Sequence, residues 1–270
     1  MSKWHIENEH VWNNENWGEN FQGITAGTDY WYFTCNSDSQ HEGIWRLNHD
    51  FTEPVRVAKS PMSNHHLGAL TFNQTNRRIF VALEPAKVWE YSAASSTTIR
   101  ISTLGGNGSK PQGDSMPWCA INPTDGLLYS SAFGDEGEKI SWVNKVHAYD
   151  PAQNFKLVRT VSLPHTLRRI QGGCFSPLGG HLYLSSDWSK AVLGYNIPPV
   201  GISDVATHLG NCAINAPDIE VEGLTIGYPK NYAVEAGNHM WVHVSCLDDD
   251  WPDGDDVYLK HIWVPDAMSV

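Results

Sequence analysis

Gln22-Gly23-Ile24-Thr25 is the first of five short apolar segments that begin beside a small residue and recur along the chain. The anchor residues of the five segments are Gly23, Gly68, Cys119, Gly173 and Gly223. Their successive spacings are 45, 51, 54 and 50 residues. A period of that size, built from short strands, is typical of a β-propeller in which each repeat forms one four-stranded sheet.

Each repeat continues with the same order of elements. A turn follows the anchor strand, as at Asn122-Pro123-Thr124-Asp125-Gly126, and leads into a second apolar strand. A third strand and an edge strand come next, and their apolar and polar side chains alternate with period two. We expect second strands at 30–33, 78–81, 127–130, 181–184 and 239–244, third strands at 44–47, 88–91, 146–149, 192–195 and 259–264, and fourth strands at 55–57, 99–101, 158–160 and 205–209.

The fifth repeat has no fourth strand of its own after its third strand. Trp4-His5-Ile6 has the apolar–basic–apolar pattern of the other fourth strands and precedes the first anchor as they precede theirs. We therefore predict that the N-terminal strand completes the last blade and closes the ring, which removes exposed strand edges. The predicted fold is all-β: a five-bladed β-propeller that forms one domain over residues 1–270.

The composition narrows the classes of partner. The net charge of −12 argues against nucleic acid and against an anionic membrane surface, whereas a cationic ligand or a metal is easier to accommodate. No apolar run approaches the length of a membrane span, and no secretory signal is visible, so we expect a cytoplasmic protein. The five cysteines are scattered and show no zinc-binding spacing, which favours buried, reduced thiols.

In a propeller, two sets of loops line the mouth of the central channel, and ligands usually bind there. The first set leads into the innermost strands and offers Gln22, His65, His66, Trp118, Gln171 and Glu222. The second set joins the second and third strands and offers an acid in every repeat: Asp38, Glu84, Asp135, Asp187 and Asp248. These residues predict a ring of carboxylates around one polar pocket.

Crowded carboxylates raise one another's pKa, so that one of them can hold a proton and act as a general acid. We expect Glu222 to be this acid and His66 to be the base, with Glu84 and Asp187 as supporting carboxylates. Glu222 and Asp187 could instead bind a divalent cation, calcium or magnesium, through their oxygens. The alternative for any one of the loop acids is an ordinary Asx-turn after a strand.

The remaining mouth residues are candidates for ligand binding. Polar contacts are expected from Gln22, His65, Gln171 and Asp135, and stacking from Trp118 and Trp188. Of the two neighbouring histidines, one could bond to its own loop while the other points into the channel. His239 and His243 lie on one face of a predicted strand, and packing is the favoured interpretation for both.

The segments Val221-Glu222-Gly223-Leu224-Thr225 and Phe21-Gln22-Gly23-Ile24-Thr25 resemble the blades of NHL, gluconolactonase and strictosidine-synthase-like propellers. Gluconolactonases similarly place a glutamate before a glycine as a calcium ligand, which implies that role for Glu222. Those families usually have six blades, whereas this chain has five repeats. Five-bladed lectins and five-bladed glycosidases are similar in architecture.

Three hypotheses about function follow from the mouth residues. The five mouth positions carry Gln, His, Trp, Gln and Glu instead of one repeated residue. This variety favours a single pocket where an enzyme acts on a small polar molecule by hydrolysis, elimination, isomerisation or cyclisation. The alternative is a binding module for a sugar, although a multivalent lectin would repeat the same polar residues in each blade. A third hypothesis is a scaffold whose acidic mouth binds a basic protein.

Overall fold

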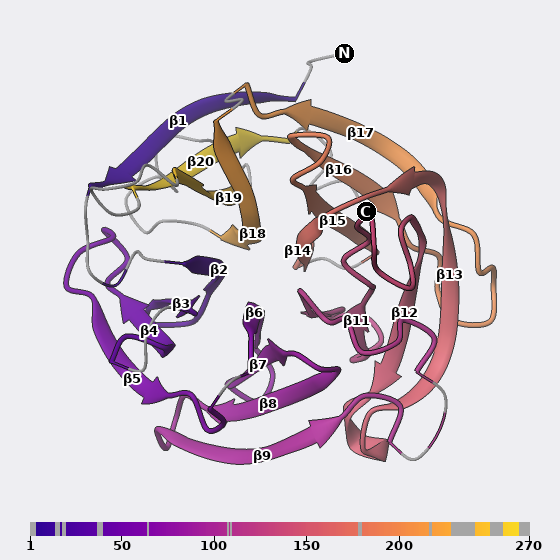
Figure 1. Ribbon diagram of the computed structural model, residues 1–270, viewed down its shortest axis with the longest axis horizontal. Helices are drawn as coiled ribbons and strands as arrows, with labels where there is room; N and C mark the ends of the chain where they lie inside the picture. Colours follow the sequence, from indigo (N-terminus) through magenta and orange to yellow (C-terminus); the bar gives the residue numbers. More distant parts are fainter. Residues whose placement is uncertain are drawn as a thin grey trace.

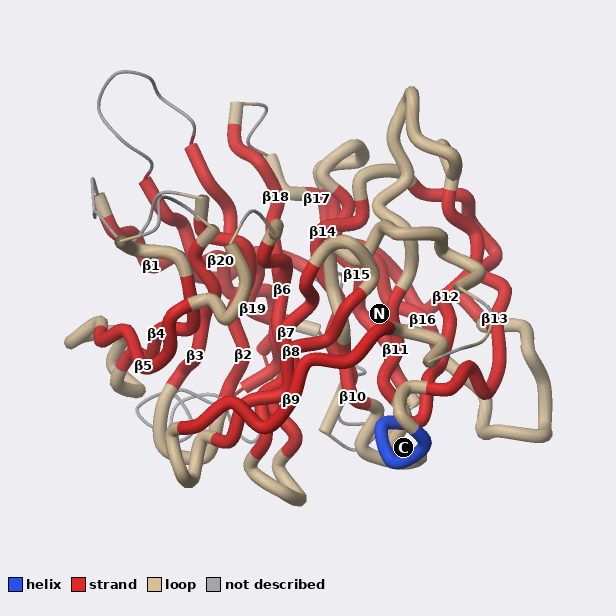
Figure 2. Tube along the Cα trace, turned by 60° about the horizontal axis from the view of Figure 1, so that its bottom comes forward, coloured by secondary structure: helices blue, strands red, loops and turns tan. Residues whose placement is uncertain are grey.

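The protein folds into a ring of five four-stranded antiparallel sheets (Figure 1). The structure is a computed structural model, and it describes residues 4–13, 17, 20–36, 40–63, 65–106, 108, 110–177, 180–215, 218–227, 241–248 and 256–264. The fold is therefore the expected five-bladed β-propeller. Strands and loops make up nearly all of the described chain (Figure 2), and the one helix described is a single 3-10 turn at Pro151–Gln153.

Each of the first four blades is one sequence repeat, with its strands in chain order from the axis outward. Blade 1 consists of β2 (Phe21–Ala26), β3 (Trp31–Cys35), β4 (Gly43–Leu47) and β5 (Val55–Lys59); blade 2 of β6 (Leu67–Asn73), β7 (Arg78–Leu83), β8 (Lys87–Ser92) and β9 (Thr97–Thr103). Blade 3 consists of β10 (Ala120–Ile121), β11 (Leu128–Ser130), β12 (Val143–Asp150) and β13 (Lys156–Leu167); blade 4 of β14 (Ile170–Phe175), β15 (His181–Ser186), β16 (Ala191–Asn196) and β17 (Thr207–Ala213).

The fifth blade joins the two ends of the described chain. It consists of β18 (Ile219–Gly227), β19 (Trp241–Asp248), β20 (Asp256–Trp263) and, on the outside, β1 (His5–Trp12). β1 pairs antiparallel with β20, with His5 opposite Trp263 and Trp12 opposite Val257 (Figure 1). The prediction that the N-terminal strand closes the ring is confirmed, and the strand is longer than the three residues that its pattern indicated.

Small residues at the anchors allow the innermost strands to approach the axis closely. A Cβ added to Gly223 would lie 2.4 Å from the Cα of Gly23, and one added to Gly68 would lie 2.1 Å from the carbonyl oxygen of Pro117. Backbone therefore packs directly on backbone around the axis, and any side chain at these positions would collide with it. This is the physical basis of the recurring small residue.

The core lies between adjacent blades and is rich in aromatic side chains. Trp31, Trp89 and Trp118 are among its largest fully buried members. All five cysteines are buried and free, as the scattered spacing predicted. His243 is fully buried on β19 with its ring 5.1 Å from that of Trp31, which confirms the packing interpretation, whereas His239 lies outside the described residues. No helix in the described part of the chain is long and apolar enough to cross a membrane.

Candidate functional site

A cavity of about 330 Å³ opens where the innermost strands meet the loops at one end of the ring. Four of its lining residues carry carboxyl groups, and three others are the expected His66, Gln22 and Gln171. The full lining consists of Asn20, Gln22, His66, Glu84, Pro117, Phe133, Glu138, Gln171, Glu220 and Glu222. The structure therefore brings five of the predicted site residues together and adds acids that the sequence patterns did not indicate.

β-Bulges direct three of these side chains into the cavity. The pairing of β2 with β3 shifts register between Phe21 and Gly23, and the pairing of β18 with β19 shifts between Val221 and Leu224. A similar shift occurs beside Gln171 in β14. A bulge re-aims the side chain of its extra residue, so Gln22, Gln171 and Glu222 leave the in-and-out alternation of their strands.

Glu222 is the most deeply buried acid of the cavity, with an exposed fraction of 1%. Its Oε1 accepts a hydrogen bond of 3.1 Å from Gln171 Nε2, which also donates to Glu220 Oε1 at 3.1 Å. Its Oε2 is buried and has no hydrogen-bond partner among the described residues. Burial, and then the charges of Glu220 and Asp187, raise the pKa of Glu222 well above its ordinary value. The raised pKa favours the protonated form of this carboxyl group.

His66 is held in one tautomer by its neighbours. The backbone N–H of Leu67 donates to Asn36 Oδ1 at 2.9 Å, which leaves the Asn36 amide nitrogen facing His66 Nδ1 at 2.9 Å. Nδ1 therefore accepts, and Nε2 carries the hydrogen that is donated to Gln22 Oε1 at 2.8 Å. Desolvation lowers the pKa of His66 while the charge of Glu84 opposes this shift, so the ring is neutral. Both ring nitrogens are engaged.

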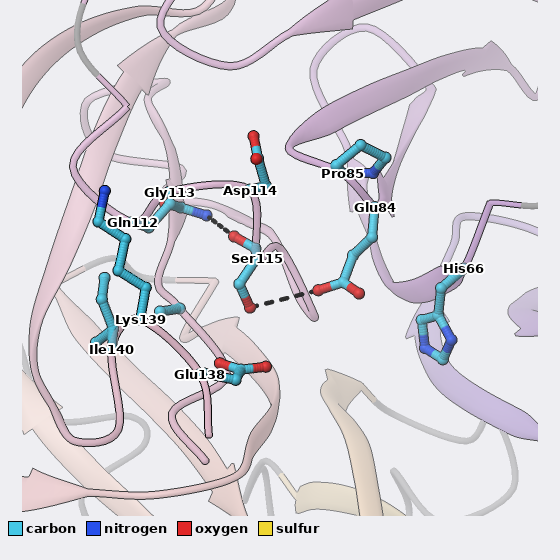
Figure 3. Close-up of a pocket in the computed structure, with 11 residues that line it drawn as sticks. His66, Glu84, Pro85, Gln112, Gly113, Asp114, Ser115, Glu138, Lys139 and Ile140 are labelled. Atoms are coloured by element: carbon cyan, nitrogen blue, oxygen red, sulfur yellow. Dashed lines mark hydrogen bonds between the residues drawn. The ribbon is translucent and has the colours of Figure 1, made fainter. Parts of the chain in front are cut away.

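A second space of about 530 Å³, here called the chamber, adjoins the cavity on the side of blade 3 (Figure 3). His66, Glu84 and Glu138 line both spaces. Glu84 follows β7, and its Oε1 accepts from the backbone N–H of Met116 at 2.9 Å, with Ser115 Oγ at 3.4 Å. The carboxyl groups of Glu84 and Glu138 are turned into the chamber from two different loops.

Glu138 comes from the long loop between β11 and β12 and is exposed to solvent. Its pKa is raised, first by desolvation and then by the negative charges of Glu84 and Asp135, although a backbone hydrogen bond from Gly134 opposes the shift. Glu84 and Glu138 thus repel each other across the boundary between the cavity and the chamber. A bound positive charge at this boundary would relieve the repulsion.

Asp187 does not line the cavity. It directly follows β15 of blade 4 and is buried. Its Oδ1 accepts from Lys190 Nζ at 2.5 Å and from the backbone N–H of Val221 at 2.9 Å, and its Oδ2 lies 3.8 Å from Arg169. These partners satisfy the carboxylate without a metal. No three His, Cys, Asp or Glu side chains in the described part of the chain lie close enough to hold a metal ion. The calcium or magnesium site expected at Glu222 and Asp187 stays a prediction.

Asp135 and Trp188 belong to a surface cluster beside the cavity. Asp135 pairs with Arg168 at 2.9 Å and with Arg169 at 3.1 Å, and the hydrogen bond from Arg169 is the main reason why its pKa is lowered. The guanidinium of Arg168 lies 4.1 Å from the ring centre of Trp188 and 4.8 Å from that of Trp142. The expected ligand-binding acid and aromatic ring are thus engaged with arginines and do not line the cavity.

Trp118 and His65 also lie away from the mouth. Trp118 is fully buried, its Nε1 donates to Ser131 Oγ at 2.9 Å, and its ring fills the space that Gly173 leaves without a side chain. His65 donates from Nδ1 to the carbonyl of Ser63 at 2.9 Å and lies 3.3 Å from Lys87 Nζ. As the sequence indicated, one histidine of the pair bonds to its own loop while the other lines the cavity.

The predicted ring of carboxylates also included Asp38 and Asp248. Asp38 lies outside the described residues. Asp248 ends β19 and is not among the described residues that line the cavity. The sequence patterns missed Glu220 and Glu138, although Glu220 precedes Glu222 by the two residues that separate neighbours on one strand face. Glu138 carries no such signal, because its position depends on the path of a loop of irregular length.

Comparisons with known proteins add little about function. No protein-family model matches the chain, and no curated protein matches it in sequence. Among solved structures, a chain from the crystal structure of the mitotic checkpoint complex is similar, with a TM-score of 0.49 and 10% identity over 94% of this chain and 91% of that chain. A protein from Lactobacillus plantarum is similar with a TM-score of 0.49 and 14% identity, over 90% of this chain and 71% of that chain. Neither likeness carries an argument about activity, and the resemblance to the NHL and gluconolactonase group stays a prediction.

Proposed function

We propose that this protein is an enzyme that acts on a small polar molecule in the central cavity by acid–base chemistry, with Glu222 as the proton donor. The observation that carries the proposal is the buried Oε2 atom of Glu222, which has no partner among the described residues although Glu222 lines an open cavity. A buried polar atom without a partner is costly, and a substrate group that bonded to it would remove that cost.

Glu222 and Glu220 form a pair with two different environments. Glu222 is buried and its raised pKa favours the protonated form, whereas Glu220 is exposed and its negative charge is one of the causes of that shift. Gln171 donates to one oxygen of each and so holds the two carboxyl groups side by side. Carboxyl groups whose environments separate their protonation states can serve as acid and base in one reaction. We assign the acid role to Glu222 and the base role to Glu220.

His66 acts in this proposal as a hydrogen-bond donor that positions the substrate. The sequence favoured His66 as the base, but its Nδ1 lone pair is held by Asn36 and its Nε2 already carries a hydrogen. Gln22, which accepts that hydrogen, lines the same cavity and can exchange this bond for one to a substrate hydroxyl or carbonyl. Among the reactions open to this acid–base pair, hydrolysis is the simplest, because it needs only water as the second reactant.

The test is turnover of a panel of methylumbelliferyl glycosides and aldonolactones by the wild-type chain and by Glu222→Gln. Glutamine keeps the shape of the side chain but cannot give up a proton, so we expect kcat to fall by about 100-fold or more. Glu220→Gln should reduce kcat to a similar extent and shift the low-pH limb of the rate profile.

Glu7→Gln is the matched control, because Glu7 is exposed on β1 and does not line the cavity. Circular dichroism and thermal melts establish that each variant is folded. Equal turnover by the wild type and Glu222→Gln, or no turnover of the panel by the wild type, would contradict the proposed hydrolysis.

A further inference from the structure

We infer that the substrate carries a basic nitrogen, and that its ammonium group is held between Glu84 and Glu138 at the boundary of the cavity and the chamber. This inference rests on the proposed function and names the class of molecule that the cavity selects. The ammonium group and the reacting group occupy different places, because the acid–base pair lies at Glu222 and Glu220.

The charge of the cavity is the first argument. Four glutamates line it, and no lysine or arginine is among its described lining residues. The chamber adds Asp114 and one base, Lys139. His66 stays neutral, so it does not offset these charges. The overall charge of −12 has the same sign and would guide a cation toward the mouth.

An acidic surface alone would not make a binding site. Glu222 gives a second, independent indication that the cavity binds a ligand. It is 1% exposed and its Oε2 is unpartnered among the described residues, at a cavity that also contains the amide groups of Gln22 and Gln171. Protein interiors rarely leave such an atom unpaired without a ligand or a bound water. The cavity is therefore built to receive a polar molecule, and its acids set the charge of that molecule.

The place of the ammonium group follows from Glu84 and Glu138. Both residues line both spaces. Figure 3 shows their carboxyl groups coming from two different loops of the chamber. Glu84 is fixed by the backbone N–H of Met116, so it presents its charge in a set direction. Glu138 is exposed on its loop. A cation between them exchanges repulsion for two charge-assisted hydrogen bonds.

An organic cation fits this arrangement better than a metal ion does. A calcium ion takes six to eight oxygen ligands that converge on one point. In the described part of the chain, no three acids or histidines converge in that way. An ammonium group needs only two or three acceptors, and its carbon chain can extend into the cavity toward Glu222.

The experiment is isothermal titration calorimetry of the full chain at about pH 7 and low salt with three probes of equal length: putrescine, aminobutanol and butanediol. They carry two, one and no ammonium groups. We expect both amines to bind at least about tenfold more tightly than butanediol. Raising the salt concentration about tenfold should weaken the binding of the amines and leave that of butanediol unchanged.

Glu138→Gln should weaken the binding of both amines about tenfold and leave that of butanediol unchanged. The matched control is Glu136→Gln, in the same loop, because Glu136 lines neither space and bonds to Arg168. Glu222→Gln should keep its affinity for the amines while it loses turnover.

The outcomes separate this inference from the proposed function. Equal binding of the three probes, no binding of putrescine at millimolar concentration, or amine binding that Glu138→Gln does not weaken would overturn recognition of a basic nitrogen. Any of these results, combined with loss of turnover in Glu222→Gln, would leave the proposed function standing. Amine binding that depends on Glu138, in a chain that turns over no substrate, would support the inference and count against the proposed enzyme.

Discussion

Glu222 makes the folded protein less stable as the pH rises. Its pKa is raised in the folded state by burial and by Glu220 and Asp187, whereas the unfolded chain ionises it at its ordinary pKa. Above that ordinary value the unfolded state has lost a proton that the folded state retains, so the free energy of unfolding falls as pH rises. The loss stops increasing only above the raised pKa, where the folded state ionises as well.

We predict that Glu222→Gln is more stable than the wild type at about pH 8 by about 1–3 kcal/mol, the usual cost of an unsatisfied buried group. The difference should shrink as the pH falls below the ordinary pKa of a glutamate, because the wild-type carboxyl is then protonated in both states. Urea denaturation at several pH values measures it. Parallel stability curves for the two proteins would contradict the raised pKa, and Glu7→Gln should follow the wild type throughout.

At the scale of single residues, the sequence predicted which side chains precede the anchors but not how each one points. Gln22 and Glu222 line the cavity because bulges re-aim them. β10 is only two residues long, so Trp118 precedes the strand and turns into the core instead. Strand length and bulges depend on pairing with neighbouring strands, which a single sequence does not reveal.

At the scale of elements, the innermost strands depend on small residues where they meet. Gly223 on β18 packs against Gly23 on β2 of the adjacent blade, and an added Cβ would lie 2.4 Å from backbone. We predict that Gly223→Ala lowers the free energy of unfolding by at least about 2 kcal/mol, because backbone cannot move aside as a flexible side chain can. Chemical denaturation measures the change.

Gly113→Ala is the matched control for this axial contact. Gly113 has a φ of +70°, so alanine there introduces backbone strain, but an added Cβ would meet nothing within 4 Å. We expect a cost of about 1 kcal/mol for strain alone. A smaller loss in Gly223→Ala than in Gly113→Ala would mean that close packing at the axis does not limit the stability of the ring.

The blade pattern was predictable because five repeats give the same strand order five times, so that errors in one repeat are corrected by the others. Ends of strands were less predictable. β17 runs over Thr207–Ala213, after the expected 205–209, because residues 205 and 162 form an isolated parallel bridge between blades before β17 begins. Such contacts between blades depend on the closed ring, so the periodicity of a single repeat cannot predict them.

At the scale of the whole molecule, the blade that closes the ring contains three histidines whose pKa values are lowered. Burial is the main cause in each case, and it lowers the pKa of His243 to about 3 and that of His261 to about 4. His10 on β1 is lowered as well. The rings of His243 and His261 are 4.6 Å apart, and Phe51 lies against both His10 and His261. Protonation of any of these rings would place a charge inside the closure.

These histidines make ring closure sensitive to acid. The unfolded chain protonates them near pH 6.5, whereas the folded blade resists protonation until about pH 4, so stability is lost as pH falls through this interval. We predict a loss of about 1.4 kcal/mol per pH unit for each histidine that is fully neutral in the fold. His261→Phe should reduce the slope by one such contribution, whereas His5→Gln, at the exposed end of β1, should leave it unchanged. Thermal melts from pH 7 to pH 4 measure the slope. His261→Phe removes one buried titrating ring, so it must also remove the proton that this ring takes up when the protein unfolds. An unaltered slope in this variant would therefore show that acid destabilises the protein at other groups.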